Sequence, residues 1–312
     1  MAYPIHRKLV IAVASSALFD LTESHAIFID KGENQYRQYQ REMKNKTLAI
    51  GVAFPFIRRF LNINKAFPKR MPVEVVLLSK NDPDTGQRVF NSIQHYGLDI
   101  TRAVFLSGKS PHKYIPAFNV SLFLSANEDD VKNAIEEGYP AGTVIPSIVN
   151  DDENDAELRV AFDFDGVLAD DESESVYHKN EDVHEFNAYE TLNAQTPHQP
   201  GPLSDLFKKL SFLQKMEAKR EKREPDYQRI IRIAIVTARS APSNERVATT
   251  LNEWCVVPEE TIFLGGIEKK HVLEIMQPHM FFDDQMRHLS SVAGNIPSVH
   301  VPFGIRNHTH KK

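Results

Sequence analysis

The sequence predicts an α/β protein built on a mostly parallel sheet, and three observations lead to this fold class. Short apolar runs rich in β-branched residues alternate with longer stretches of helical character. Several of these runs end in carboxylate, hydroxyl or ammonium side chains. The two halves of the chain also repeat one layout. Strands that alternate with helices favour a parallel sheet with right-handed crossovers, and such sheets bind ligands at the carboxyl ends of their strands.

The most informative stretch is the strand predicted over Leu158–Phe162. It is followed by two carboxylates, Asp163 and Asp165, and then by Gly166, which permits a sharp turn. Two carboxylates this close repel each other unless a proton or a cation lies between them. Mg²⁺ prefers oxygen ligands and shares its coordination shell with phosphate and water. The motif therefore predicts a magnesium site at the end of a buried parallel strand.

Three further apolar runs are predicted strands, and each leads to a side chain that suits phosphate chemistry. A hydroxyl can hydrogen-bond a phosphoryl oxygen, an ammonium group can neutralise a nucleophile and a phosphate, and more carboxylates can complete a metal site. These strands and the groups that follow them are Ile230–Val236 with Thr237, Thr261–Leu264 with Lys269, and His279–Phe282 with Asp283 and Asp284.

The order Asp-x-Asp, Thr, Lys, Asp-Asp resembles the haloacid dehalogenase (HAD) superfamily of aspartate-nucleophile phosphatases, over about residues 156–303. Almost the whole chain resembles the type I cytosolic 5′-nucleotidases. The strings that carry this second resemblance are residues 12–19 (AVASSALF), 53–56 (AFPF), 171–174 (DESE), 236–241 (VTARSA) and 281–285 (FFDDQ). The resemblance implies a HAD-like fold, dependence on Mg²⁺, and hydrolysis of nucleoside 5′-monophosphates, with AMP a leading substrate. The first motif reads DFDGV where the vertebrate enzymes have DGDAV, so base and sugar preference stay open.

These resemblances imply a role for each candidate residue. Asp163 is expected to attack phosphorus and form an aspartyl-phosphate, and Asp165 to act as general acid and then general base. Thr237 and Lys269 are expected to stabilise charge on the transferring phosphoryl group. The expected Mg²⁺ ligands are Asp163, Asp165 through its backbone carbonyl, Asp283 and Asp284, and either of the last two can be the direct ligand. The candidates for substrate binding are Arg239, Ser240 and Lys109.

The repeated layout predicts a duplicated α/β unit. Residues 75–125 overlay residues 233–283 without a gap, and residues 11–12 overlay 160–161. In the first copy, uncharged residues stand where the second copy has its four carboxylates. They are Ala14, Ser16, Ser125 and Ala126. The first copy is therefore expected to be unable to hold Mg²⁺ in the same way.

The domain boundaries follow from this repeat. We expect a degenerate HAD-like unit at residues 1–150 and a catalytic unit at 156–312, joined by the acidic stretch 147–157. Residues 170–229 are too many for a simple connection. They are expected to fold as a small, mostly helical cap that excludes water from the phosphoryl centre.

Two features of the N-terminal half could either contact a ligand or have a purely structural role. Lys109, in the string SGKS at residues 107–110, follows the strand predicted over 103–106 and could accept an anion there. A surface turn is the favoured interpretation of this short motif. Phe54 and Phe56 are expected to pack in the core rather than to line a cleft.

The composition excludes several classes of function. With 42 acidic and 37 basic residues and a net charge of −5, the chain has no broad basic field for a nucleic-acid polymer. No apolar segment reaches the roughly 18 residues that a membrane span needs. The single cysteine, Cys255, excludes a disulfide within the chain, suits a reducing cytoplasm, and is expected to be a buried apolar residue. A nucleotide effector and a homo-oligomer are both compatible with the sequence.

Two alternatives to a 5′-nucleotidase follow from the same residues. The first is a HAD phosphatase or phosphotransferase that acts on another small phosphorylated metabolite. The second is a non-catalytic nucleotide sensor, to which a degenerate N-terminal unit gives some support. The complete set of candidate catalytic groups in the C-terminal half weighs against the sensor.

Overall fold

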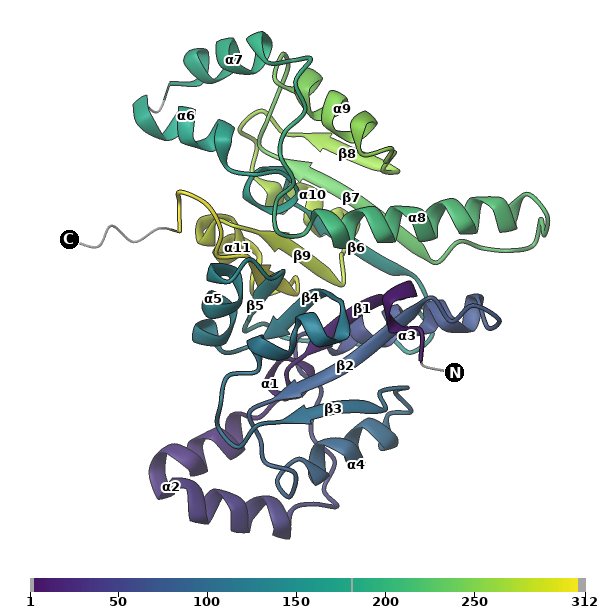
Figure 1. Cartoon of the computed structure of the whole chain (residues 1–312), viewed down its shortest axis with the longest axis vertical. Helices are drawn as coiled ribbons and strands as arrows, with labels where there is room; N and C mark the ends of the chain where they lie inside the picture. The colour runs from purple at the N-terminus through teal and green to yellow at the C-terminus, as the bar shows by residue number, and fades with distance from the viewer. Residues whose placement is uncertain (1–2, 181, 308–312) are drawn as a thin grey trace. The chain divides into compact units, whose positions relative to one another are not determined.

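The computed structural model describes residues 3–180 and 182–307 and contains two compact units, each with a parallel β-sheet and helices packed against it (Figure 1). The N-terminal unit comprises residues 1–144 and 148–153, and the C-terminal unit comprises residues 145–147 and 154–312. The α/β class predicted from the sequence is confirmed.

In the C-terminal unit, the described strands run parallel in the order β10-β9-β6-β7-β8, so β6 lies at the centre. The strands are β6 (Leu158–Phe162), β7 (Ile231–Thr237), β8 (Glu260–Phe263), β9 (Met280–Asp283) and β10 (Ser298–His300). The helices are the irregular turn η4 (Phe164–Leu168), α6 (Glu172–Asn180), α7 (Val183–Leu192), α8 (Ser204–Glu221), α9 (Asn244–Glu253), α10 (Lys269–Met276) and α11 (Met286–Val292).

In the N-terminal unit, the described strands run parallel in the order β5-β4-β1-β2-β3. The strands are β1 (Leu9–Val13), β2 (Val73–Ser79), β3 (Arg102–Phe105), β4 (Val120–Ser125) and β5 (Ala141–Ile145). The helices are α1 (Ser15–Leu18), α2 (Thr22–Glu42), α3 (Phe54–Ala66), α4 (Gln87–His95) and α5 (Glu128–Glu136), with short turns η1 (Ile5–Arg7), η2 (His112–Tyr114) and η3 (Pro116–Phe118).

The two sheets have one topology. In both, the strand that comes first in sequence lies at the centre, with the second and third strands on one side and the fourth and fifth on the other. The backbone bonds at the end of the central strand also correspond. The N–H of Ala14 donates to the carbonyl of Leu124 at 2.8 Å, and the N–H of Asp163 donates to that of Phe282 at 2.8 Å. The expected degenerate half of similar topology is therefore present.

Burial on both faces explains the apolar sequence of β6. Ala161 and Phe162, which point to opposite faces of the strand, have no exposed surface, and the ring of Phe162 stacks on that of Phe282 with centroids 5.1 Å apart. Helix α8 covers one face with fully buried side chains. They are Leu206, Phe207 and Leu210. A strand covered on both faces forms a continuous apolar run, and its polar groups appear only at its ends.

The segment expected to form a cap divides into two parts. Helices α6 and α7 lie side by side as a hairpin, and α6 also contacts η4 (Figure 1). Helix α8 instead packs on the sheet, where the Gln214 side chain donates to the carbonyl of Ile231 at 3.2 Å. The cap is thus narrower than residues 170–229, because only α6 and α7 lie away from the sheet face. We call this hairpin the cap.

Two interpretations of single residues can be compared directly with the structure. Phe54 and Phe56 are buried in α3, which confirms that they pack in the core. Cys255 is exposed, so its expected burial was wrong. The reason is local: α9 ends at Glu253, and Cys255 lies in the following turn with a left-handed φ of 54°.

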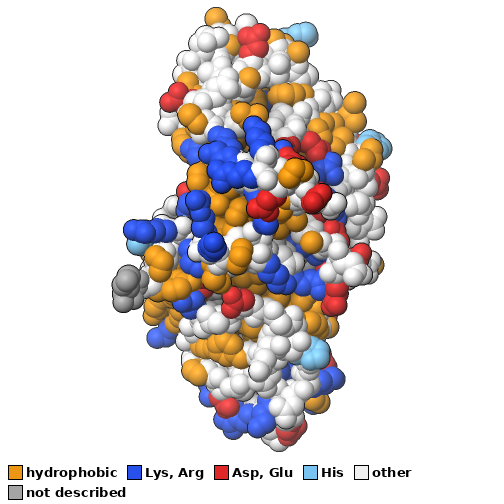
Figure 2. Space-filling model, turned by 90° about the vertical axis from the view of Figure 1, so that its right-hand side faces the viewer, with side chains coloured by type: hydrophobic (Ala, Val, Ile, Leu, Met, Phe, Trp, Pro, Cys, Tyr) orange, Lys and Arg blue, Asp and Glu red, His pale blue; other side chains and the backbone are white. Residues whose placement is uncertain are grey.

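The surface carries charges of both signs. On the face drawn in Figure 2, Lys and Arg side chains gather in several groups, and Asp and Glu side chains lie among them. None of the helices in the described part of the chain has the length and apolar character that crossing a bilayer requires.

Candidate active site

Asp163 lies directly after the central strand β6 and is almost completely buried, with 4% of its surface exposed. Its Oδ1 accepts a hydrogen bond from the N–H of Phe164 at 2.7 Å. This bond fixes the carboxylate against the start of η4 and leaves Oδ2 for other partners. The strand end therefore presents one carboxylate oxygen in a fixed direction.

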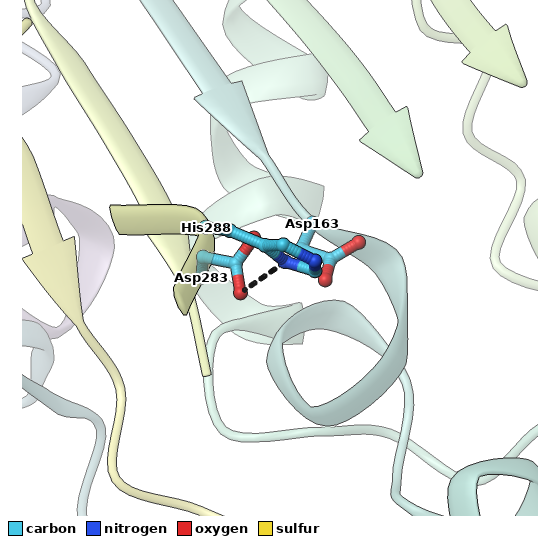
Figure 3. A group of neighbouring side chains, drawn as sticks. All are labelled: Asp163, Asp283 and His288. Carbon is cyan, nitrogen blue, oxygen red and sulfur yellow. Dashed lines mark hydrogen bonds and ion pairs between the residues drawn. The ribbon is translucent and has the colours of Figure 1, made fainter. Parts of the chain in front are cut away.

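A lysine joins this carboxylate to one on the neighbouring strand. The Nζ of Lys269, from the first turn of α10, lies 2.7 Å from Oδ2 of Asp163 and 2.7 Å from Oδ2 of Asp283. Strands β6 and β9 are paired neighbours, so both carboxylates emerge at one edge of the sheet. Figure 3 shows Asp163 and Asp283 facing each other, with His288 of α11 beside them. The Nδ1 of His288 lies 3.0 Å from Oδ2 of Asp283.

The two carboxylates differ in electrostatic environment. Burial raises the pKa of Asp163 to about 7, the charge of Asp283 adds to this rise, and the Lys269 ion pair opposes it. Burial also acts to raise the pKa of Asp283, but the Lys269 charge and a hydrogen bond with His288 outweigh it and hold the pKa below its ordinary value. An acidic group with a raised pKa next to one with a lowered pKa is typical of functional sites.

A third carboxyl group, Asp284, lies in surroundings that disfavour its negative charge. Burial, together with the charges of Asp163 and Asp283, raises the pKa of Asp284 to about 9. Among the described residues, its buried Oδ1 has no hydrogen-bond partner. Buried polar atoms are nearly always paired, so this oxygen indicates a missing cation or donor. Three carboxylates that face a single Lys269 ammonium group fit a divalent cation with oxygen ligands.

Gly166 is required where Asp284 comes closest to the chain. Its φ is +71°, and a Cβ added there would lie 2.7 Å from Cγ of Asp284. Glycine alone tolerates both the left-handed backbone and this approach at no steric cost. The glycine of the first motif therefore makes room for a carboxylate of the last one.

Asp165 is held by an arginine through both of its oxygens. Arg239 donates from Nε to Oδ2 at 2.7 Å and from Nη2 to Oδ1 at 2.6 Å. The guanidinium was expected to contact substrate, but the structure shows it 4% exposed and bonded on all sides by protein. Its other partners are Glu190, His198 and the carbonyl of Ser243. This geometry favours a positioning role for Arg239.

The remaining candidates lie in different settings. Thr237 ends β7, next to β6, with 1% of its surface exposed, and its Oγ1 accepts from the N–H of Arg239 at 3.3 Å. Ser240 is half-buried in the loop after β7. Lys109 is exposed in the turn after β3, where its N–H donates to the carbonyl of Leu106. The structure thus gathers Asp163, Lys269, Asp283 and Asp284, places Thr237 on the adjacent strand, and leaves Lys109 in the other unit.

Sequence reasoning missed the residues that surround this cluster. His288 lies on α11. Glu190 lies in the cap and His198 follows it, and in the sequence both are distant from any strand end. A buried glutamate in a cap helix has no motif of its own. The one available signal for His288 was its distance of five positions from Asp283, which brings a helical side chain back toward the strand end.

Comparisons with known proteins identify the family of the chain. The sequence model of a family described as 5′-nucleotidase matches residues 1–308. Over 288 residues the chain is 36% identical to the human protein named cytosolic 5′-nucleotidase 1B, an alignment that covers 90% of this chain and 46% of that protein. The chain therefore spans less than half the length of this curated relative. No solved structure matches the chain at a comparable level. Because the family match extends over nearly its whole length, the chain belongs to the 5′-nucleotidase family.

Proposed function

We propose that this protein is a Mg²⁺-dependent 5′-nucleotidase that hydrolyses nucleoside 5′-monophosphates such as AMP to a nucleoside and phosphate. One observation carries the proposal: a buried Lys269 lies between Asp163 and Asp283 at the carboxyl ends of adjacent parallel strands. Open α/β sheets bind ligands at this edge. The name of the human relative supports the same activity.

In the first step, Oδ2 of Asp163 attacks phosphorus, and the bond between phosphorus and the 5′ oxygen breaks as the aspartyl-phosphate forms. Asp165 donates a proton to the departing 5′ oxygen. In the second step, water attacks phosphorus while Asp165 accepts its proton, and the bond from phosphorus to Asp163 breaks. Lys269 stabilises negative charge throughout, because its ammonium group already contacts the attacking carboxylate at 2.7 Å.

The acidic cluster fits Mg²⁺ as the cofactor. Asp163, Asp283 and Asp284 would hold the ion, together with the backbone carbonyl of Asp165, and the unpartnered Oδ1 of Asp284 favours this residue as a direct ligand. When bound, the ion would neutralise carboxylate and phosphate charge and so favour attack of one anion on another. His288 would orient Asp283 through its contact with Oδ2.

The N-terminal unit has a different part in the proposal. We assign residues 1–150 as a degenerate unit that serves as scaffold, and residues 156–312 as the catalytic unit with α6 and α7 as its cap. Thr237 and Ser240 are assigned to phosphate and substrate binding, whereas Lys109 belongs to a surface turn. We assign the protein to the cytosol, which the name of the relative supports.

The test is phosphate release from a panel of nucleoside monophosphates, with glucose 6-phosphate as a sugar phosphate, in Mg²⁺ and in excess EDTA. We expect Mg²⁺-dependent release that is at least 10-fold faster from nucleotides than from the sugar phosphate. Faster release from the sugar phosphate would favour a general HAD phosphatase. Nucleotide binding without phosphate release would favour the sensor.

A further inference from the structure

Asp165 is joined to the cap by an unbroken series of charged contacts. Arg239 binds both oxygens of Asp165, and on its other side it pairs with Glu190 of α7. We propose that Glu190 is a positioning residue that holds Arg239, and through it the Asp165 carboxylate, in the orientation that proton donation to the leaving group needs. This inference rests on the proposed 5′-nucleotidase activity. We call the Asp165–Arg239–Glu190 series the relay.

Protein groups surround all three nitrogens of the Arg239 guanidinium. Nε and Nη2 bind Asp165, and Nη2 also lies 3.2 Å from Nε2 of His198. Nη1 binds Glu190 and the carbonyl of Ser243. A planar guanidinium bound in this way fixes the position of Asp165 relative to Glu190, because it cannot rotate without breaking several charge-assisted hydrogen bonds.

Glu190 is in turn anchored inside the cap. Only 1% of its surface is exposed, and its Oε1 accepts from Oγ of Ser173 at 2.6 Å and from Nη1 of Arg246 at 3.0 Å. Ser173 lies on α6 and Arg246 on α9, so the glutamate joins both cap helices to the body of the unit. The position of Asp165 therefore depends on the packing of the cap.

The N-terminal unit shows which of these contacts the fold alone requires. There Arg88 corresponds to Arg246, and its Nη1 lies 3.3 Å from Oε1 of Gln40 in α2. Nε of Arg88 donates to the carbonyl of Lys46 at 2.9 Å, just as Nε of Arg246 donates to that of Thr196 at 2.8 Å. The contact between this arginine and the preceding helix is thus common to both units.

The relay itself occurs only in the unit that has the carboxylates. At the position of Arg239 the N-terminal unit has Asn81, and at the position of Glu190 it has Gln40, which is uncharged. The shared topology therefore tolerates a glutamine at this position. The negative charge of Glu190 and the guanidinium of Arg239 accompany Asp165, which indicates that they serve its chemistry and that the shared topology does not require them.

The substitution Glu190→Gln tests the proposal, because it places in the cap the residue that the N-terminal unit already has at the corresponding position. The two substrates are AMP, whose alkoxide leaving group needs a proton, and p-nitrophenyl phosphate, whose weakly basic leaving group does not. We expect kcat for AMP to fall on the order of 10-fold, with KM within about twofold, and kcat for p-nitrophenyl phosphate to change less than twofold. Equal losses on both substrates would overturn the relay.

Two further variants serve as controls for the effect of Glu190→Gln on the two rates. Tyr189→Phe, on the same helix, removes a hydroxyl that donates to Glu172 and does not touch the relay, so both rates should be unchanged. Asp163→Asn removes the proposed nucleophile and should abolish both reactions. If Asp163→Asn keeps both activities, the proposed function itself fails, whatever Glu190 does.

A double-mutant cycle decides the case with AMP alone. In an Asp165→Asn background, Glu190→Gln should cause no further fall in kcat if it acts through Asp165. A further fall equal to that in the wild type would contradict the proposal. Should Glu190→Gln fail to fold, Ser173→Ala removes one hydrogen bond to Glu190 and should lower the ratio of AMP to p-nitrophenyl phosphate turnover in the same direction. An unchanged ratio would then overturn the proposal.

Discussion

The loop after the central strand differs between the two units of the chain. In the N-terminal unit Leu18 follows Ala14 by four positions, and in the C-terminal unit Leu168 follows Asp163 by five. Leu18 and Leu168 occupy corresponding positions at the ends of the two loops. The N–H of Gly51 donates to the carbonyl of Leu18 at 2.9 Å, and the N–H of Gly201 donates to the carbonyl of Leu168 at 2.8 Å. The catalytic loop thus has one residue more, and inserted residues in helical turns are frequent at functional sites.

The extra residue changes what the loop can present. The N-terminal loop folds as the short helix α1, whereas η4 contains the extended backbone of Asp165 and the left-handed Gly166. The separate overlay of residues 11–12 on 160–161, which also placed Ser16 on Asp165, therefore ends inside this loop. A carboxylate pair at a strand end needs a loop of a particular shape in addition to two aspartates.

The end of the fourth strand gives a second comparison of the two units. The side chain of Ser125 accepts from the N–H of Asn127 at 3.0 Å, and that of Asp283 accepts from the N–H of Gln285 at 2.8 Å. Both residues satisfy the turn after the fourth strand of their unit. A serine can do this with its hydroxyl, but only the aspartate has a second oxygen for Lys269. At this position both units have the turn contact, and the C-terminal unit adds the ion pair with Lys269.

The largest effect is expected at the first carboxylate. Asp163→Asn should lower kcat on the order of 10³-fold or more, because an amide cannot form the phosphoenzyme. The matched change Ala14→Ser, at the corresponding strand end of the N-terminal unit, should leave kcat unchanged. Steady-state turnover of AMP measures both. Activity above a few per cent in Asp163→Asn would exclude it as the nucleophile.

The next largest effect concerns the cation. EDTA should abolish turnover and added Mg²⁺ should restore it. Asp284→Asn should raise the Mg²⁺ concentration for half-maximal activity by on the order of 10-fold or more, because it removes the charge of a carboxylate with a free oxygen. The N-terminal unit provides the control, since Ser125→Ala removes a turn contact without touching the acidic cluster. Full activity in excess EDTA would exclude the metal.

Much of this comparison could be predicted from sequence, because strands covered on both faces leave a simple apolar signal. The predicted strand Leu158–Phe162 has those bounds in the structure, and the predicted strand Ile230–Val236 begins and ends one residue later. The four strand ends of the catalytic unit could be ordered for the same reason. Side chains at neighbouring strand ends converge without any need to know how the helices pack.

The sequence could not predict contacts made by side chains that cross between elements. Arg239 follows a strand end and carries a charge that suits phosphate, so it was expected to bind substrate. Its true surroundings depend on where α7 places Glu190, and this position depends on the packing of the cap. The exposure of Cys255 also depends on tertiary structure, because the end of α9 places this residue in the following turn. The local pattern of apolar residues predicts the strands, whereas the hydrogen-bond networks between side chains depend on the tertiary structure.

A smaller effect is expected from the glycine that the longer loop contains. Gly166→Ala introduces a Cβ 2.7 Å from Cγ of Asp284, in addition to the strain of a left-handed backbone. Gly266→Ala is the matched control, because φ there is +92° and nothing lies within 4 Å of the added Cβ. We expect a loss of about 1 kcal/mol in the free energy of unfolding for Gly266→Ala and about 1–3 kcal/mol more for Gly166→Ala. Equal thermal midpoints would show that Asp284 does not pack on this loop.

The smallest effect concerns the acid stability of the cap. Burial acts to raise the pKa of Glu190, but hydrogen bonds with His198 and Ser173 and the charge of Arg239 outweigh it and hold the pKa well below its ordinary value. A carboxyl group whose pKa is lower in the folded protein than in the unfolded chain stabilises the fold fully at pH values above its unfolded pKa of about 4.3. This stabilisation is lost as the pH falls below that value. Glu190→Gln, which resembles Gln40 of the N-terminal unit, should therefore lower the thermal midpoint by several degrees near pH 7 and by less near pH 3.5.

The partly exposed Glu172 gives the matched control for this pH window. Its pKa is also lowered, chiefly by a hydrogen bond from Tyr189, but 42% of its side chain is exposed, so solvent screens its ion pair with Arg246. Glu172→Gln should shift the midpoint by no more than about 2–4 °C, the change that roughly 1 kcal/mol produces in a unit of this size. His198 has a raised pKa, so its contribution is present at low pH and is lost only as the pH rises. A difference between wild type and Glu190→Gln that stays constant from pH 7 to pH 3.5 would mean that the charge of Glu190 does not hold the cap.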